Sequence, residues 1–225
     1  QHSQSLETMF ACVPGLRVLM PVFPQDAKGM LIAAIEDNSP TVVIEHRWCH
    51  YVRGVVPEGH YTTDITEPKK LMEGEHLTIA ATSFSTLEAM QAAEALKLVG
   101  VNAELFDVRV VSPLDTSQIE NSFKKTGRLI TVDTGHKSYG IGAEIIARVM
   151  ETHAGMSQSN PVRIAMPDHP VPSSRGYTPG IYPSSKEILN KALDMFHIEQ
   201  DRRDGANSAL TKNIGALPVD VPDPA

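Results

Sequence analysis

Two histidine-containing segments of this sequence, one with serines and one with a cysteine, could transfer protons or bind a metal ion. His2 precedes Ser3 and Ser5, either of which could cap a helix that includes Glu7 in its first turn. The positive end of a helix dipole lowers the pKa of a nearby imidazole, so His2 would be a neutral group that can exchange protons. The alternative is that His2 has only a structural role at the start of the helix. The residues next to His2 are compatible with either role.

A second pattern, "HRWCH", places His46, Cys49 and His50 at a spacing that could hold a metal ion. A zinc site of this type usually takes a second pair of ligands, and one cluster alone is a weak signal. The favoured interpretation is a connecting segment that buries Trp48.

Gly140 and Gly142 lie between an expected strand and an expected helix, where phosphate-binding loops occur. Position 145 is Ile, so the dinucleotide fingerprint is incomplete, and no Gly-Lys-Ser/Thr follows Gly135. The favoured interpretation is a tight turn with close packing of helix on strand. The segment 168–180 could contact an anion or a partner, or form a proline-stiffened surface loop.

The elements that must position these residues alternate between short apolar strands and helices. Strands are expected at residues 16–20, 41–46, 77–83, 102–111, 128–135 and 162–167. Helices are expected at residues 24–38, 85–100, 112–127, 139–154 and 183–196. This alternation predicts an α/β protein with largely parallel sheets between layers of helices.

The elements divide unevenly along the chain. Residues 74–197 supply a complete α/β/α unit of ordinary domain size, whereas residues 1–45 supply too few elements for a domain. We therefore expect residues 1–45 to be the C-terminal part of a domain whose earlier strands precede Gln1. Residues 46–73 are expected to connect the two units, and residues 198–225 to form a disordered tail.

Composition narrows the class of protein. Hydrophobic residues make up 41% and charged residues 21%, which is typical of a globular protein with a core. The net charge of −7 and the scattered Lys and Arg residues argue against a nucleic-acid partner. Two cysteines are too few for a disulfide framework, and there is no signal peptide or long apolar run. A cytoplasmic protein without a membrane partner is expected.

Seven stretches, in this order and spacing, resemble one family. They are "QHSQSLE", "VPGLRVLMP", "DAKGMLIAAIEDNSP", "VRVVSPLD", "KKTGRLITVDTG", "GIGAEIIARV" and "DHPVP". The family is the β subunit of the first component of 2-oxo acid dehydrogenases, which includes the pyruvate, branched-chain and acetoin enzymes. The resemblance implies that residues 1–45 are the second half of a pyrimidine-binding domain and that residues 74–197 are a complete transketolase-type C-terminal domain.

The resemblance also implies a function and partners. Such a chain takes part in the thiamine-diphosphate-dependent oxidative decarboxylation of a 2-oxo acid, with acyl transfer to lipoamide. The diphosphate is held through Mg by an α-type subunit that carries a Gly-Asp-Gly motif, which this sequence lacks. A second β-type subunit and a lipoyl acyltransferase core are the other expected partners. The compartment would be the cytoplasm, or the mitochondrial matrix in a eukaryote.

Two sets of site residues follow from the resemblance. His2 matches the histidine of the family's "HSQ" motif, which hydrogen-bonds the substrate carboxylate or the thiamine-bound intermediate and helps to transfer protons. Backbone carbonyls of the family's "AIRDNNP" segment hold a potassium ion, and these positions are Ala34, Ile35, Asp37 and Ser39 here. No residue of this chain is matched to the cofactor itself.

Two departures from the family leave the substrate open. The segments "HRWCHYVRGVVPEGHYTTD" and "VPSSRGYTPGIYPSSKEI" differ from the family's usual sequences. One alternative is therefore a split transketolase-like or deoxyxylulose-phosphate-synthase-like enzyme. Another is a non-catalytic module that serves assembly or dimerisation.

Overall fold

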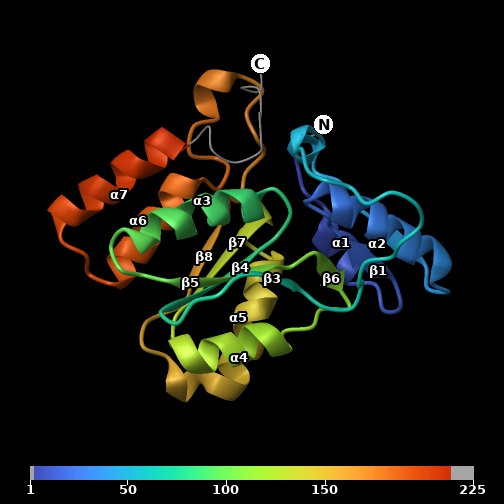
Figure 1. Ribbon diagram of the computed structural model, residues 1–225, viewed down its shortest axis with the longest axis horizontal. Helices are drawn as coiled ribbons and strands as arrows, with labels where there is room; N and C mark the ends of the chain where they lie inside the picture. Colours follow the sequence, from blue (N-terminus) through green and yellow to red (C-terminus); the bar gives the residue numbers. More distant parts are fainter. Residues whose placement is uncertain (1–2, 214–225) are drawn as a thin grey trace.

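The structure is a computed structural model that describes residues 3–213 (Figure 1). The N-terminal unit consists of α1 (Glu7–Ala11), β1 (Arg17–Leu19), α2 (Pro24–Glu36) and β2 (Thr41–Val43). Pro24 at the first turn of α2 has the φ that a helix start requires, as the sequence predicted. Met30 is buried on one face of α2, and Ile35 is exposed on another. The helix therefore packs on its sheet through one side only.

A three-stranded sheet forms the base of this unit, in the order β2-β1-β6. β1 pairs with β2 in parallel, with Arg17 opposite Thr41. β6 (Val110–Ser112) comes from the C-terminal half of the sequence and pairs with β1 in the antiparallel sense. The two halves of the sequence therefore share a sheet.

The sequence predicted one strand over residues 102–111, and the structure forms two. β5 (Ala103–Asp107) belongs to the larger sheet and β6 to the smaller one. Between them, the Val108 amide donates to the Ala81 carbonyl and the Arg109 carbonyl accepts from the Met20 amide, both at 2.8 Å. One continuous run of buried residues therefore feeds two sheets, which periodicity alone does not reveal.

The larger sheet has five strands in the order β3-β5-β4-β7-β8. Its strands are β3 (Lys69–Met72), β5, β4 (Leu77–Ala81), β7 (Leu129–His136) and β8 (Val162–Met166). All neighbours pair in parallel except β3 with β5. The expected α/β fold with a largely parallel sheet is confirmed. However, β3 lies inside the range 46–73 that was expected to be a connection, which also contains the 3₁₀ helix η1 (Arg47–Tyr51).

Helices cover both faces of this sheet (Figure 1). One core cluster joins the sheet to α3 (Ser85–Lys97) and α6 (Ser185–Met195), and the other joins it to α4 (Ser117–Thr126) and α5 (Ile141–His153). The second cluster also contains Val18 and Met20 from the N-terminal unit. The same apolar core therefore holds the two units together.

The expectation of a disordered tail from residue 198 is wrong for part of that segment. A helix, α7 (Gln200–Asn213), packs Ala206 and Leu210 into the core cluster of α3 and α6. Arg202 donates to the Val99 carbonyl at 2.6 Å, and Arg203 donates to Asp194 at 2.6 Å. Residues 214–225 of the expected tail lie outside the described residues. Within residues 3–213, none of the helices combines the length and the apolar character needed to cross a bilayer.

Candidate functional site

A cavity of about 810 Å³ lies where the two units meet. Its lining comes mainly from the segment before α1, from the segment after β2, and from the ends of β4 and β7, with Phe10 of α1, Met20 after β1 and Tyr182 before α6. The lining residues are Ser3, Gln4, Ser5, Leu6, Phe10, Met20, Ile44, Glu45, His46, Arg47, Trp48, His50, Ser83, Thr134 and Tyr182. This volume is in the usual range for small-molecule sites, and the site lies beyond the carboxyl end of β4, where ligands bind in open α/β sheets.

Two buried carboxyl groups, Glu7 and Asp133, lie behind this lining. The Ser5 hydroxyl donates to Glu7 and lies 3.4 Å from the Thr134 hydroxyl. Asp133 accepts from the Gly135 amide at 3.0 Å and the Ile141 amide at 2.9 Å. The start of α1 therefore meets the end of β7 through polar side chains.

Burial, and secondly the Asp133 carboxylate, raise the pKa of Glu7 to about 7. Burial also raises the pKa of Asp133, against the opposing effect of its hydrogen bonds from Gly135 and Thr82. Glu7 Oε1 is buried and has no hydrogen-bond partner among the described residues. A β carbon at Gly135 would lie 2.6 Å from that oxygen, so a larger residue there would displace the Glu7 carboxyl group. Glu7 therefore carries a proton in a large share of molecules near neutral pH.

Aromatic rings form one wall of the cavity. The His46 ring stacks on Phe84 with centroids 5.4 Å apart, and Trp48 meets Phe84 edge-on at 4.9 Å and Tyr182 at 5.4 Å. His46 Nδ1 accepts from the Trp48 amide at 3.2 Å, so the ring's own proton is on Nε2. Burial, with a smaller effect of His50, lowers the pKa of His46 to about 4. His46 is therefore a neutral N–H donor at physiological pH.

The metal interpretation of "HRWCH" receives no support from the structure. Within residues 3–213, no group of three or more His, Cys, Asp and Glu side chains is arranged to hold a metal ion. Burial raises the pKa of the Cys49 thiol to about 12, whereas a metal ligand would be a thiolate. His50 instead pairs with Glu45 at 3.3 Å. His46 and Trp48 are part of the cavity wall, so the segment does more than connect the units.

The predicted turn at Gly140 and Gly142 is confirmed. A β carbon at Gly142 would lie 2.6 Å from Thr131 Oγ1, so α5 packs closely on β7.

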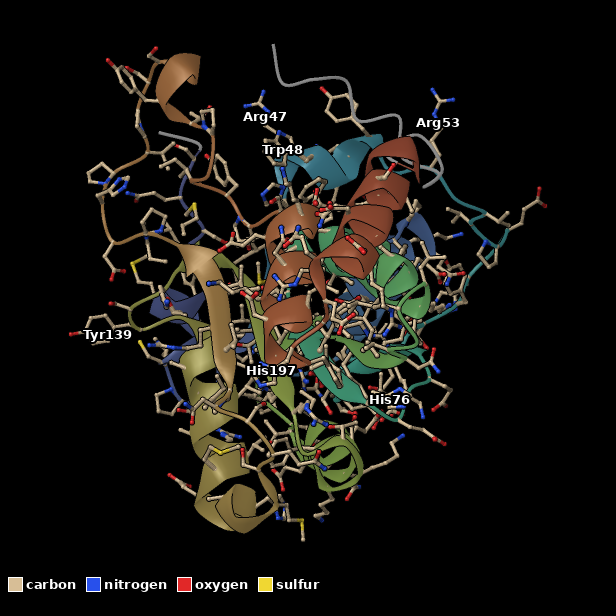
Figure 2. The ribbon with its side chains drawn as sticks, turned by 90° about the vertical axis from the view of Figure 1, so that its left-hand side faces the viewer. Arg47, Trp48, Arg53, His76, Tyr139 and His197 are labelled. Carbon is tan, nitrogen blue, oxygen red and sulfur yellow. The ribbon has the colours of Figure 1, made fainter. Side chains whose placement is uncertain are left out.

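In the loop after β8, Asp168 accepts from the Ser138 amide at 3.0 Å and from the Ser138 hydroxyl at 2.5 Å. His197 lies away from Trp48 (Figure 2). None of these residues lines the cavity.

His2 lies outside the described residues. The residues that follow it, Ser3, Gln4 and Ser5, line the cavity. The expected potassium ligands Ala34, Ile35, Asp37 and Ser39 are at the C-terminal end of α2 instead, and none of them lines the cavity. The residues expected at the catalytic site and at the potassium site therefore belong to two separate regions, the cavity and the C-terminal end of α2.

Ser83, Asp133 and the burial of Glu7 were not predicted from the sequence. Ser83 and Asp133 follow apolar strand residues, and polar residues at the carboxyl ends of parallel strands are a usable signal for a site. The burial of Glu7 has no such signal, because it depends on the approach of β7, whose Asp133 lies 126 residues later in the chain (133 − 7).

Residues 67–184 match the family described as the transketolase C-terminal domain, and residues 1–49 match the transketolase pyrimidine-binding domain. This chain belongs to the transketolase family. The family match begins near β3, at residue 67, before the expected boundary at residue 74.

Curated relatives of this transketolase-family chain are named as beta subunits of pyruvate dehydrogenase and of an acetoin oxidoreductase. It is 39% identical over 193 residues to the pyruvate dehydrogenase E1 component subunit beta of Bacillus subtilis, covering 85% of this chain and 59% of the relative. It is 36% identical over 195 residues to the acetoin:2,6-dichlorophenolindophenol oxidoreductase subunit beta of the same organism. This match covers 87% of this chain and 57% of the relative. The mitochondrial pyruvate dehydrogenase E1 component subunit beta of Saccharomyces cerevisiae is 34% identical over 204 residues, with 88% and 56% covered. The resemblance found in the sequence is confirmed, and the chain spans less than two thirds of these relatives.

A solved structure shows the same fold. A split-gene transketolase, determined as an inactive β4 tetramer, superposes with a TM-score of 0.66 at 19% identity. The match covers 91% of this transketolase-family chain and 61% of the solved one.

Proposed function

We propose that this chain is the β-type part of a thiamine-diphosphate-dependent 2-oxo acid dehydrogenase that acts only together with an α-type subunit. The observation that carries the proposal is the position of the segment that resembles the family's His-bearing motif. Its residues Ser3, Gln4 and Ser5 line the cavity between the two units. The names of the relatives, all of them subunits beta, support the reaction class.

The described residues do not fit the diphosphate end of the cofactor. Mg²⁺ takes carboxylate and phosphate oxygens, and residues 3–213 contain no cluster of acidic side chains arranged for it. The Gly-Asp-Gly motif is also absent from the sequence. We therefore assign the diphosphate and Mg to the α-type partner and derive no step through them.

His2 is proposed as the catalytic residue of this chain. An imidazole that titrates near neutrality can hydrogen-bond the substrate carboxylate and can accept or return a proton. The neighbouring lining residues would place it beside the bound substrate. The proposed role is that of a positioned acid and base.

The end of α2 fits a monovalent cation. No described residue donates a hydrogen bond to the carbonyls of Ala34 and Ile35, and the C-terminus of a helix carries the negative end of its dipole. The Ser39 carbonyl accepts from the Thr41 hydroxyl at 3.1 Å and retains a second lone pair. Asp37 also pairs with Arg17 at 3.1 Å, which fixes this turn. We propose K⁺ on the carbonyls of Ala34, Ile35, Asp37 and Ser39.

The domain and partner assignments are also part of this proposal. Residues 1–45 would be the C-terminal part of a pyrimidine-binding domain, and a second β-type subunit would pair with this one. A lipoyl acyltransferase core would be the acyl acceptor. The proposed compartment is the cytoplasm, or the mitochondrial matrix in a eukaryote.

Reconstitution with an α-type subunit, thiamine diphosphate and Mg²⁺ tests the proposal. The readout is reduction of 2,6-dichlorophenolindophenol that depends on a 2-oxo acid. We expect reduction with both subunits together and none with either alone, and a lower rate when tetramethylammonium replaces K⁺. Turnover of ketose phosphates in place of 2-oxo acids would establish the split transketolase alternative. Assembly with the α-type subunit but no turnover of either substrate class would establish the non-catalytic module.

A further inference from the structure

Two carboxyl groups, those of Glu7 and Asp133, lie together behind the cavity lining. Both side chains are buried, Glu7 completely. A β carbon at Gly135 would lie 2.6 Å from Glu7 Oε1 and 3.5 Å from Asp133 Oδ1, so both carboxyl groups face the same point of the backbone. Two buried carboxylates at such a place repel each other strongly, because little water screens their charges. The pair therefore holds a proton.

The hydrogen bonds show which carboxyl group carries this proton. Asp133 accepts three of them, from the Thr82 hydroxyl at 3.1 Å, the Gly135 amide at 3.0 Å and the Ile141 amide at 2.9 Å. Donors of this kind stabilise the ionised form of a carboxyl group. From other described residues Glu7 receives a hydrogen bond only from Ser5, and its Oε1 has no partner. Glu7 is therefore the protonated member, and its pKa of about 7 allows it to gain and lose the proton near neutral pH.

The Ser5 hydroxyl connects this buried proton to the cavity. Ser5 is half-buried and lines the cavity, and its Oγ lies 3.4 Å from the hydroxyl of Thr134, another lining residue. A hydroxyl group has one donor and two acceptor positions. Ser5 can therefore accept a proton from the cavity side while it gives its own proton to Glu7 Oε2, and the reverse transfer uses the same contacts.

The other titratable group near Glu7 offers no second route. His136 of β7 lowers the pKa of Glu7 through its charge, but its Nδ1 is bonded to the Pro167 carbonyl at 2.8 Å. His136 does not line the cavity. Among the described residues, Ser5 is therefore the group that links Glu7 to the cavity.

We propose that Glu7 is a proton-exchanging group of the cavity, which takes up and returns one proton through the Ser5 hydroxyl. In the uptake direction, a group in the cavity gives a proton to Ser5 Oγ while the Ser5 proton moves to Glu7 Oε2. The exchanging group is a bound water or a bound molecule with an acidic or basic oxygen or nitrogen. The use of this proton in turnover rests on the proposed function, whereas the exchange itself does not.

Infrared spectroscopy of the chain alone, without cofactor or partner, detects the proton directly. The carbonyl stretch of a protonated carboxyl group should appear when the pH falls from about 8 to about 6, across the pKa of Glu7. Glu7→Gln should lack this band. Asp107 is a second buried carboxyl group whose pKa burial raises to about 7, so Glu7→Gln should retain the band of Asp107. Asp107 accepts from Thr86, which is completely buried, and neither residue lines the cavity. Asp107 therefore serves as an internal control without a route to the cavity.

The rate of protonation tests the route. A proton source released by light at about pH 8 starts the reaction, and time-resolved infrared spectroscopy follows the Glu7 band. Ser5→Ala should keep the band at equilibrium but should slow its appearance by about 10²-fold or more, the usual effect of a positioned proton donor or acceptor. Ser5→Thr, which keeps a hydroxyl, should retain most of the rate. The rate of the Asp107 band should be the same in all these chains.

Thr8 provides a matched control on α1, because it follows Glu7 directly and does not line the cavity. Thr8→Ala should protonate Glu7 as fast as the unchanged chain does. An unchanged rate in Ser5→Ala would show that Glu7 exchanges by local opening of α1, and this result would overturn the proposal. Loss of the rate in Ser5→Thr, or absence of a Glu7 band, would also overturn it. Because no turnover is measured, these outcomes are independent of the dehydrogenase assay.

Discussion

At the scale of single residues, Glu7 makes the stability of this protein depend on pH. Its pKa is raised from 4.5 to about 7 by burial, so its contribution is fully present below about pH 4.5 and is lost as the pH rises through 7. The shift corresponds to about 3 kcal/mol. Glu7→Gln, which cannot ionise, should lose up to that much less stability than the unchanged chain between pH 5 and pH 8. Chemical denaturation at the two pH values measures this, and parallel losses in both chains would contradict it.

His46 should act in the opposite direction. Its pKa is lowered from 6.5 to about 4, so its contribution is present above about pH 6.5 and is lost as the pH falls through 4. His46→Asn keeps an acceptor for the Trp48 amide but cannot titrate in this range. The variant should therefore lose less stability than the unchanged chain between pH 6.5 and pH 4. His76 also accepts a backbone amide, that of Asn102 at 3.0 Å, and lies away from Trp48 (Figure 2), so His76→Asn is the control. Equal effects of the two substitutions would refute the assignment.

The contrast between His2 and Ser83 shows what the sequence could reveal about the site. His2 was proposed because its segment resembles a motif of the family. Ser83 has no motif, and its features are a positive φ and an unpaired buried hydroxyl. Both features arise only when β4, α3 and the segment after β2 come together, so no local pattern could predict them.

At the scale of elements, the strand and helix alternation was predictable because each element carries its own periodicity. α7 was missed because, among residues 200–210, it buries only the apolar residues Ala206 and Leu210, and most of its other residues are polar. The division of residues 103–112 into β5 and β6 was missed because the two strands are only two residues apart and strand-forming residues continue between them. In both cases the missing information is tertiary, namely which surface the segment packs against.

The packing of α7 gives a prediction at this scale. Leu210 is 4% exposed and contacts the core, whereas Leu98 at the end of α3 is 63% exposed. Leu210→Ala should lower the free energy of unfolding by about 2 kcal/mol or more, as buried leucine truncations do. Leu98→Ala should change it by less than about 0.5 kcal/mol. Equal losses in thermal or chemical unfolding would mean that α7 does not contribute to the core.

At the scale of the whole molecule, exposed apolar side chains lie on both helices of the N-terminal unit. Met9 and Val13 lie on and just after α1, and Leu31 and Ile35 lie about one turn apart on α2, with Ile35 75% exposed. Exposed apolar patches usually mark contact surfaces, and we expect the chain to associate with a second copy through the Leu31 and Ile35 surface of α2. Sedimentation velocity at micromolar concentration should show a dimer or larger species that Ile35→Glu weakens and Leu98→Glu does not. A strict monomer at these concentrations would contradict the expectation.

The claim that this chain contributes a catalytic group to a two-subunit dehydrogenase is tested most directly through His2. In the reconstituted enzyme, His2→Ala should lower turnover of the 2-oxo acid by about 10²- to 10⁴-fold, the usual range for a positioned acid or base. His2→Asn, which keeps a hydrogen-bonding group but cannot titrate, should also be impaired. The affinity for thiamine diphosphate should change little in either variant. Turnover close to that of the unchanged enzyme in both variants would contradict the catalytic assignment.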